Sequence, residues 1–121
     1  MNEQGPFFIE VLKNNISEES KMKYLTLSAD YNSFLKDDYD LSFSYKDLNI
    51  PLPLLERIFK WYETYSPIIS MSDEERSNSI SLINLLDSEG LELTEQLKEI
   101  VGEKAKIKYY SEGRLDYLTF L

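Results

Sequence analysis

The sequence lacks the two residue types on which most enzymes and metal sites depend. It contains no histidine and no cysteine among its 121 residues. The absence of histidine removes the commonest general base and metal ligand, and the absence of cysteine removes thiolate chemistry and any disulfide. We therefore predict that the chain is not an enzyme, and that it uses no metal and no cofactor.

A pair of carboxylates is the one catalytic arrangement that this composition leaves open. Glycosidases work with two such groups, and a chain with 22 Asp and Glu residues offers many chance pairs. The four glycines are scattered, so they form no phosphate-binding loop. A small histidine-free carboxylate enzyme therefore stays as an alternative, which a deep pocket holding two carboxylates would support.

An acidic loop is the first candidate binding site. Asp37, Asp38, Tyr39 and Asp40 place three carboxylates around one aromatic ring, in a loop expected over residues 30–40. The run lacks the glycine-centred spacing of a calcium loop, so no bound metal explains these acids. An aromatic ring with acidic neighbours is a good anchor for a basic protein. We predict a partner-binding patch here.

A stripe of glutamates is the second candidate binding site. Glu89, Glu92, Glu99 and Glu103 recur at helical spacing, with Gln96 between them. Residues 73–103 contain nine acids against two bases, so the acidity is concentrated here. The stripe lies opposite the apolar face of the expected helix, and the competing interpretation is an ordinary solvated face.

Two other groups of residues have a structural explanation that competes with binding. Trp61 and Tyr65 could anchor a partner, but core packing is the default for rings of this size. A basic cluster on the expected C-terminal hairpin is too small for nucleic acid, and we interpret it as protection of a strand edge: Lys104, Lys106, Lys108 and Arg114.

Hydrophobic periodicity predicts the elements that position these residues. Apolar or alternating runs predict strands, and spacings of three and four predict two helices, the second beginning at the capping box of Ser72 and Glu75. The expected strands cover residues 7–12, 22–28, 41–45, 104–109 and 115–121, and the expected helices cover residues 51–67 and 72–102.

This order of elements predicts a single α+β domain over residues 1–121. Three strands, two helices and two strands follow one another, so we expect a mainly antiparallel sheet with both helices packed on one face. Gly90 falls inside the second helix, where it marks either a close contact or a break. Gly102 is expected to end that helix.

The charge of the chain limits the partners it can bind. The 22 acids and 13 bases give a formal net charge of −9, which repels nucleic acid and anionic membranes. The same charge attracts a basic protein, in a complex that weakens as salt is added. The N-terminus lacks the basic and apolar regions of a signal peptide, so we expect a cytoplasmic location.

Residues 40–110 resemble the immunity proteins of contact-dependent growth inhibition, which belong to bacterial polymorphic toxin systems. The resemblance rests on Leu52-Pro53-Leu54-Leu55, Ile58, Trp61, Gly90-Leu91-Glu92-Leu93, Leu97-Lys98, Val101-Gly102 and Ile107-Lys108-Tyr109. It implies a cytoplasmic inhibitor that blocks the active site or substrate groove of a cognate toxin, with a nuclease as one class of target. It assigns no catalytic residue.

A self-associating structural or regulatory adaptor is the alternative from a different class. Exposed sheet edges or an aromatic surface would support it. The sequence leaves the oligomeric state open.

Overall fold

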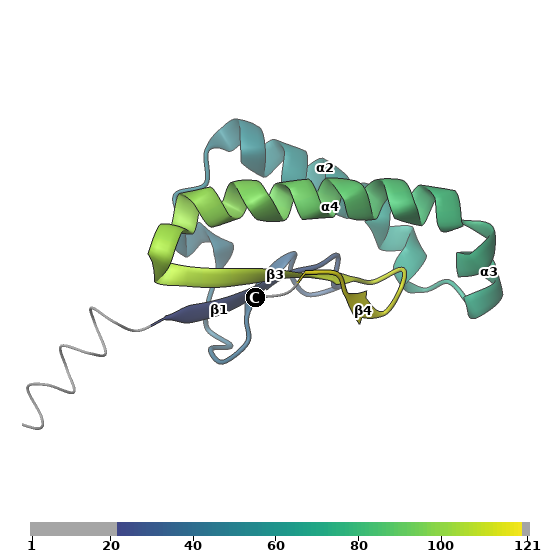
Figure 1. Cartoon of the computed structure of the whole chain (residues 1–121), viewed down its shortest axis with the longest axis horizontal. Coiled ribbons are helices and arrows are strands. Elements are labelled where there is room, and N and C mark those ends of the chain that lie inside the picture. The colour runs from purple at the N-terminus through teal and green to yellow at the C-terminus, as the bar shows by residue number, and fades with distance from the viewer. Residues whose placement is uncertain (1–21, 120–121) are drawn as a thin grey trace, which may run out of the picture.

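The computed structural model describes residues 22–119, which form one sheet and three α-helices. In chain order the elements are β1 (Lys23–Leu27), β2 (Leu35–Asp37), the 3-10 helix η2 (Tyr45–Asp47), α2 (Leu52–Ile69), α3 (Asp73–Asn78), α4 (Ile80–Val101), the 3-10 helix η3 (Gly102–Lys104), β3 (Ala105–Ser111) and β4 (Asp116–Tyr117). Figure 1 shows α2 and α4 lying together above the strands. The strand expected at residues 7–12 falls outside the described residues.

The sheet is mixed, which corrects the expectation of a mainly antiparallel one. Its strand order is β2-β1-β3-β4, and the central pair, β1 and β3, is parallel with Leu25 opposite Ile107. The two outer pairs are antiparallel. The helices lie between β1 and β3 in the chain, and such a helical crossover returns the chain so that the two strands run in the same direction.

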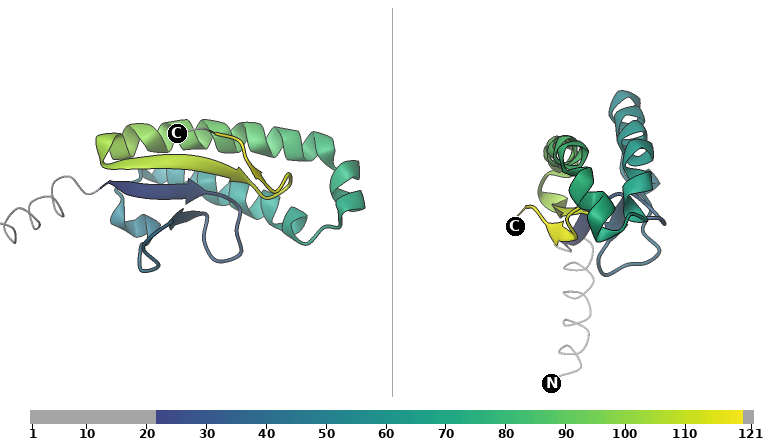
Figure 2. Two further views of the ribbon diagram at one scale, coloured as in Figure 1. Left: turned by 60° about the horizontal axis from the view of Figure 1, so that its bottom comes forward. Right: turned by 90° about the vertical axis from the view of Figure 1, so that its right-hand side faces the viewer.

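One face of this sheet carries the core. Along β3, Ala105, Ile107, Tyr109 and Ser111 are buried while Lys106 is exposed, so the strand alternates as its sequence predicts. The helices α2 and α4 cover that face (Figure 2), and their buried residues belong to the same core as those of the strands. The α+β class and the placement of helices on one face are therefore confirmed.

The prediction of a strand at residues 41–45 is wrong. Leu41 is fully exposed, and the segment forms turns that lead into η2. Asp40 accepts hydrogen bonds from the Ser42 amide, and Ser44 forms a capping box with Asp47 at the start of η2. These side chains compete with strand pairing for the backbone amides. The strand instead lies at residues 35–37, inside the expected loop.

The helices follow the periodic pattern, with one interruption. The first extends through Pro67 to Ile69, and the capping box of Ser72 and Glu75 is present. The second predicted helix is divided at Ser79 into α3 and α4. Gly102 ends α4 with a φ of 59°, a conformation that favours glycine.

Gly90 marks a close contact, and the partner is a strand rather than a helix. A β-carbon at this position would lie 2.2 Å from Cε1 of Tyr109 on β3. Only glycine lets α4 approach the sheet this closely, so the Tyr109 ring sits directly against the helix backbone.

We predict that Gly90→Ala destabilises the protein. Alanine improves helix propensity by about 1 kcal/mol, but overpacking the buried ring costs about 1–3 kcal/mol, and the severe overlap places the cost at the upper end. Urea unfolding should show a net loss. Ser88→Ala, at an exposed position of the same helix, is the control and should be neutral or stabilising. Equal behaviour of the two variants would contradict the close contact.

Candidate functional site

The acidic loop is held together by its own carboxylates. Asp37 is buried, accepts a hydrogen bond from the Tyr39 amide at 2.9 Å and lies 3.8 Å from the Lys23 ammonium. Asp38 accepts a hydrogen bond from the Thr26 hydroxyl and pairs with Lys108 at 2.9 Å. The hydrogen bond to Asp38 raises the pKa of Lys108. Two of the three acids are therefore engaged in holding the sheet.

The predicted patch at residues 37–40 thus offers a partner mainly its aromatic ring. Tyr39 is 83% exposed, while Asp40 accepts hydrogen bonds from both the amide and the hydroxyl of Ser42. The four residues are adjacent in space, as predicted. The negative charge of these carboxylates is largely taken up by contacts within the protein.

Two of the basic hairpin residues pair with acids inside the protein. β4 pairs only with Tyr110 and Ser111 of β3, so Lys106 and Lys108 lie on a stretch of β3 that pairs with β1 on one side alone. Lys108 pairs with Asp38, and Arg114 reaches the buried Asp87. The interpretation as edge protection therefore stays a prediction for Lys106, while Lys108 and Arg114 also form ion pairs.

The glutamate stripe divides into two parts. Arg57 of α2 contacts Glu89 at 3.2 Å and Glu92 at 2.7 Å, and these carboxylates raise the pKa of the guanidinium. These two acids therefore join α2 to α4. Glu99 and Glu103 are exposed and form no ion pair with any residue between 22 and 119.

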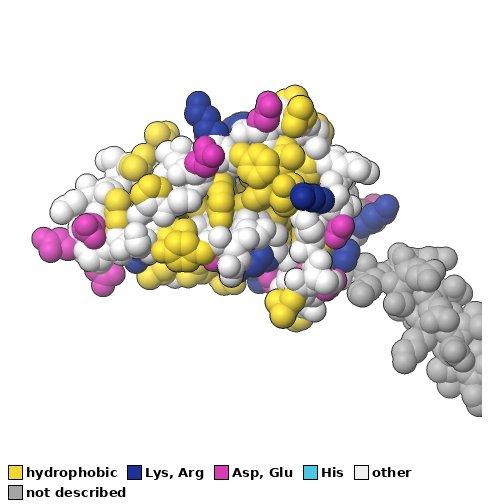
Figure 3. Space-filling model, turned by 180° about the vertical axis from the view of Figure 1, so that it is seen from behind, with side chains coloured by type: hydrophobic (Ala, Val, Ile, Leu, Met, Phe, Trp, Pro, Cys, Tyr) yellow, Lys and Arg dark blue, Asp and Glu magenta, His cyan; other side chains and the backbone are white. Residues whose placement is uncertain are grey.

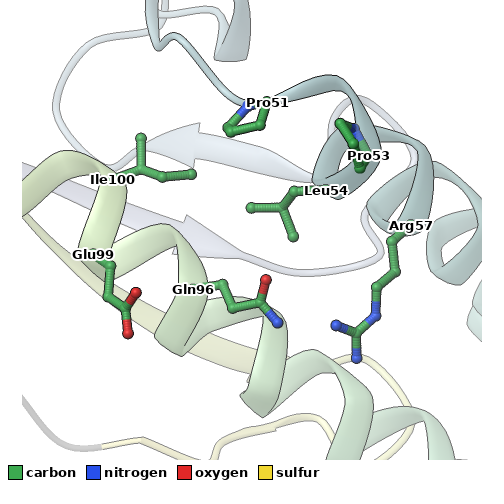
Figure 4. A pocket seen from close by; sticks show the side chains of 7 residues that line it. All are labelled: Pro51, Pro53, Leu54, Arg57, Gln96, Glu99 and Ile100. Carbon is green, nitrogen blue, oxygen red and sulfur yellow. The ribbon is translucent and has the colours of Figure 1, made fainter.

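A groove lies beside the unpaired part of the stripe. It has a volume of about 610 Å³ between the start of α2 and the C-terminal half of α4, and Pro51, Pro53, Leu54, Arg57, Gln96, Glu99 and Ile100 line it. Figure 4 shows Pro51, Leu54 and Ile100 gathered at one end, with Glu99 and Arg57 on opposite sides. The groove therefore combines an apolar wall with one carboxylate and with the guanidinium of Arg57, which is paired with Glu89 and Glu92.

A second cavity of about 360 Å³ lies where α3 meets the turn between β3 and β4. Asp73 is its only carboxylate, and Glu99 is the only one in the groove. Neither cavity brings two carboxylates together. Residues 22–119 also contain no group of three or more potential metal ligands.

The most highly connected polar group, Asp87, was not predicted as a functional residue. Its carboxylate is buried on α4 and accepts hydrogen bonds from the hydroxyls of Tyr65 and Tyr109, each at 2.7 Å. It also accepts from the Ser111 hydroxyl at 2.8 Å and from Arg114 Nε at 3.2 Å. The spacing of Asp87 could have indicated its burial, because a residue four positions after Ile83 falls on the apolar face of the helix.

This network keeps its tyrosines protonated. Burial, followed by weaker effects of its neighbours, raises the pKa of Tyr65 to about 12, and burial raises that of Tyr109 further. Tyr65, Tyr109 and Ser111 have no solvent exposure, so no substrate can reach them. Trp61 donates to the Leu86 carbonyl at 2.9 Å. Trp61 and Tyr65 are thus core residues, as the default interpretation held.

Comparisons with known proteins found no relative for this chain. No family model matches it, and neither a curated protein nor a solved structure does. Within residues 22–119, no helix combines the length and the apolar character needed to cross a bilayer.

We predict that Asp87→Ala destabilises the protein by about 3–5 kcal/mol, because it leaves the buried hydroxyls and Arg114 without their shared acceptor. Urea unfolding would measure the loss. Asp116→Ala, on the exposed strand β4, is the control and should cost less than about 1 kcal/mol. Similar losses for the two variants would show that the network contributes little.

The raised tyrosine pKa predicts a loss of stability in alkali. An unfolded tyrosine ionises near pH 10, while Tyr65 keeps its proton until about pH 12. Its contribution is complete below about pH 10 and is lost as the pH rises toward about 12. Denaturant unfolding at increasing pH should show this slope, and Tyr65→Phe should reduce it although the variant is less stable at neutral pH. An unchanged slope would refute the assignment.

Proposed function

We propose that this chain is an inhibitor that binds and neutralises a basic toxin domain, as its resemblance to immunity proteins implies. One observation carries the proposal. Two acids of α4 and η3 form no ion pair in the described structure: Glu99, which lines an open groove with an apolar wall, and Glu103, which follows the end of α4.

The groove suits a long basic side chain of the partner. Arginine and lysine bury an apolar stem while keeping their charged head near an acid. Pro51, Leu54 and Ile100 would contact such a stem, and Glu99 would pair with the head. A nuclease uses basic residues to hold its substrate, so an inhibitor that occupies those residues would exclude nucleic acid by competition.

Co-expression with the product of the gene immediately upstream tests the proposal. We expect the chain to rescue growth from that product and to co-purify with it. Failure of both would overturn the proposed function.

The contact surface is tested by reversing the two free acids. We predict that Glu99→Lys with Glu103→Lys slows association with the toxin at least about tenfold and lowers its dependence on salt, because electrostatic steering is lost. Stopped-flow or surface plasmon resonance would measure the rate. Glu74→Lys with Asp116→Lys makes the same change in charge at two exposed positions of α3 and β4 and is the matched control. Equal effects would place the contact elsewhere.

A further inference from the structure

The side of the molecule opposite α4 carries a cluster of aromatic rings. We call it the α2 aromatic face, and it consists of Phe34, Tyr45, Phe59 and Tyr62. The Phe34 ring lies 4.7 Å from that of Tyr45 and 5.5 Å from that of Phe59, measured between centroids. Phe34 is buried, but Phe59 is 37% exposed. Figure 3 shows the apolar surface across the centre of this side.

The rings come from three separate segments: the residue before β2, η2 and α2. The Tyr62 hydroxyl donates to the carbonyls of Asp30 and Tyr31, which precede β2. Tyr45 lies on η2, which is closed by the capping box of Ser44 and Asp47. A preorganised aromatic surface binds with little loss of conformational entropy, and such surfaces on monomers are often interaction sites.

The charges around this face are nearly balanced. Glu56 and Glu63 lie one helical turn on either side of Phe59, and the bases are Lys46 and Lys60. All four are exposed and form no ion pair with the rest of residues 22–119. Together with Asp47, three acids oppose two bases, whereas the whole chain has a net charge of −9. The partner that fits is therefore not strongly basic.

We infer that the α2 aromatic face binds a second copy of this chain. Two copies repel one another through their net charge, and the repulsion is least where each surface carries both signs. A two-fold interface brings the same patch of each copy together, so it must be self-complementary. Here the acids of one copy can approach the bases of the other around the two Phe59 rings.

This dimer uses the side of α2 that faces Phe34 and Tyr45, whereas the groove lies between α2 and α4. It also responds to salt in the opposite sense to the toxin complex. Salt screens the long-range repulsion between two acidic copies more than the close acid–base contacts at their interface, and so strengthens the dimer, whereas it weakens a complex that depends on long-range attraction between acid and base. The inference does not depend on the proposed function and is tested without a toxin.

Analytical ultracentrifugation over a range of protein and salt concentrations tests the dimer. We expect the wild type to associate reversibly and more tightly in high salt. Glu56→Lys with Glu63→Lys leaves one acid against four bases on the face, and should weaken association at least about tenfold, equivalent to about 1.4 kcal/mol. Adding Lys46→Glu and Lys60→Glu restores the mixture of signs and should restore association.

The control separates the local effect from net charge. Glu74→Lys with Glu103→Lys lowers the overall negative charge by the same amount, on α3 and η3, and should leave association unchanged or stronger. A wild type that stays monomeric at the highest concentration in high salt would overturn the inference. So would a dimer that Glu56→Lys with Glu63→Lys leaves intact.

Discussion

The buried carboxylate of Asp87 organises this small domain. It accepts hydrogen bonds from α2, from β3 and from the turn after β3, so one acid on α4 connects the helices to the sheet. A charge in the interior is tolerated only when its acceptor capacity is filled. The chain has no disulfide, and this network cross-links elements that are far apart in sequence. Gly90 brings the Tyr109 ring into range, one turn along the same helix.

Several surface acids also connect elements of the fold. Asp38 and Lys108 connect β2 to β3, and Arg57 connects α2 to Glu89 and Glu92 of α4. A count of acids in the sequence therefore overstates what a partner meets. After these pairs are formed, Glu99 in the groove and Glu103 on η3 remain unpaired within residues 22–119, while the face around Phe59 presents rings with charges of both signs. The two surfaces therefore differ in charge.

Periodicity determined the local structure. The helical spacing around Ile58 predicted α2, the capping box at Ser72 predicted the start of α3, and the alternation around Ile107 predicted β3. The absence of histidine and cysteine likewise limits the available chemistry without any coordinates. Helical spacing, capping and strand alternation depend on residues that are close together in the chain, so the sequence alone indicates them.

Tertiary structure alone decided which strands pair and which charges remain free. The parallel pairing of β1 with β3 depends on packing across the whole crossover, and it places Leu25 opposite Ile107 in one mixed sheet. The acids at Asp37 and Glu89 look alike in sequence to Glu99, yet the first two meet a base from a distant element. The physical reason is that an ion pair or a buried hydrogen bond depends on distance in space. The sequence determines that distance only through the complete fold.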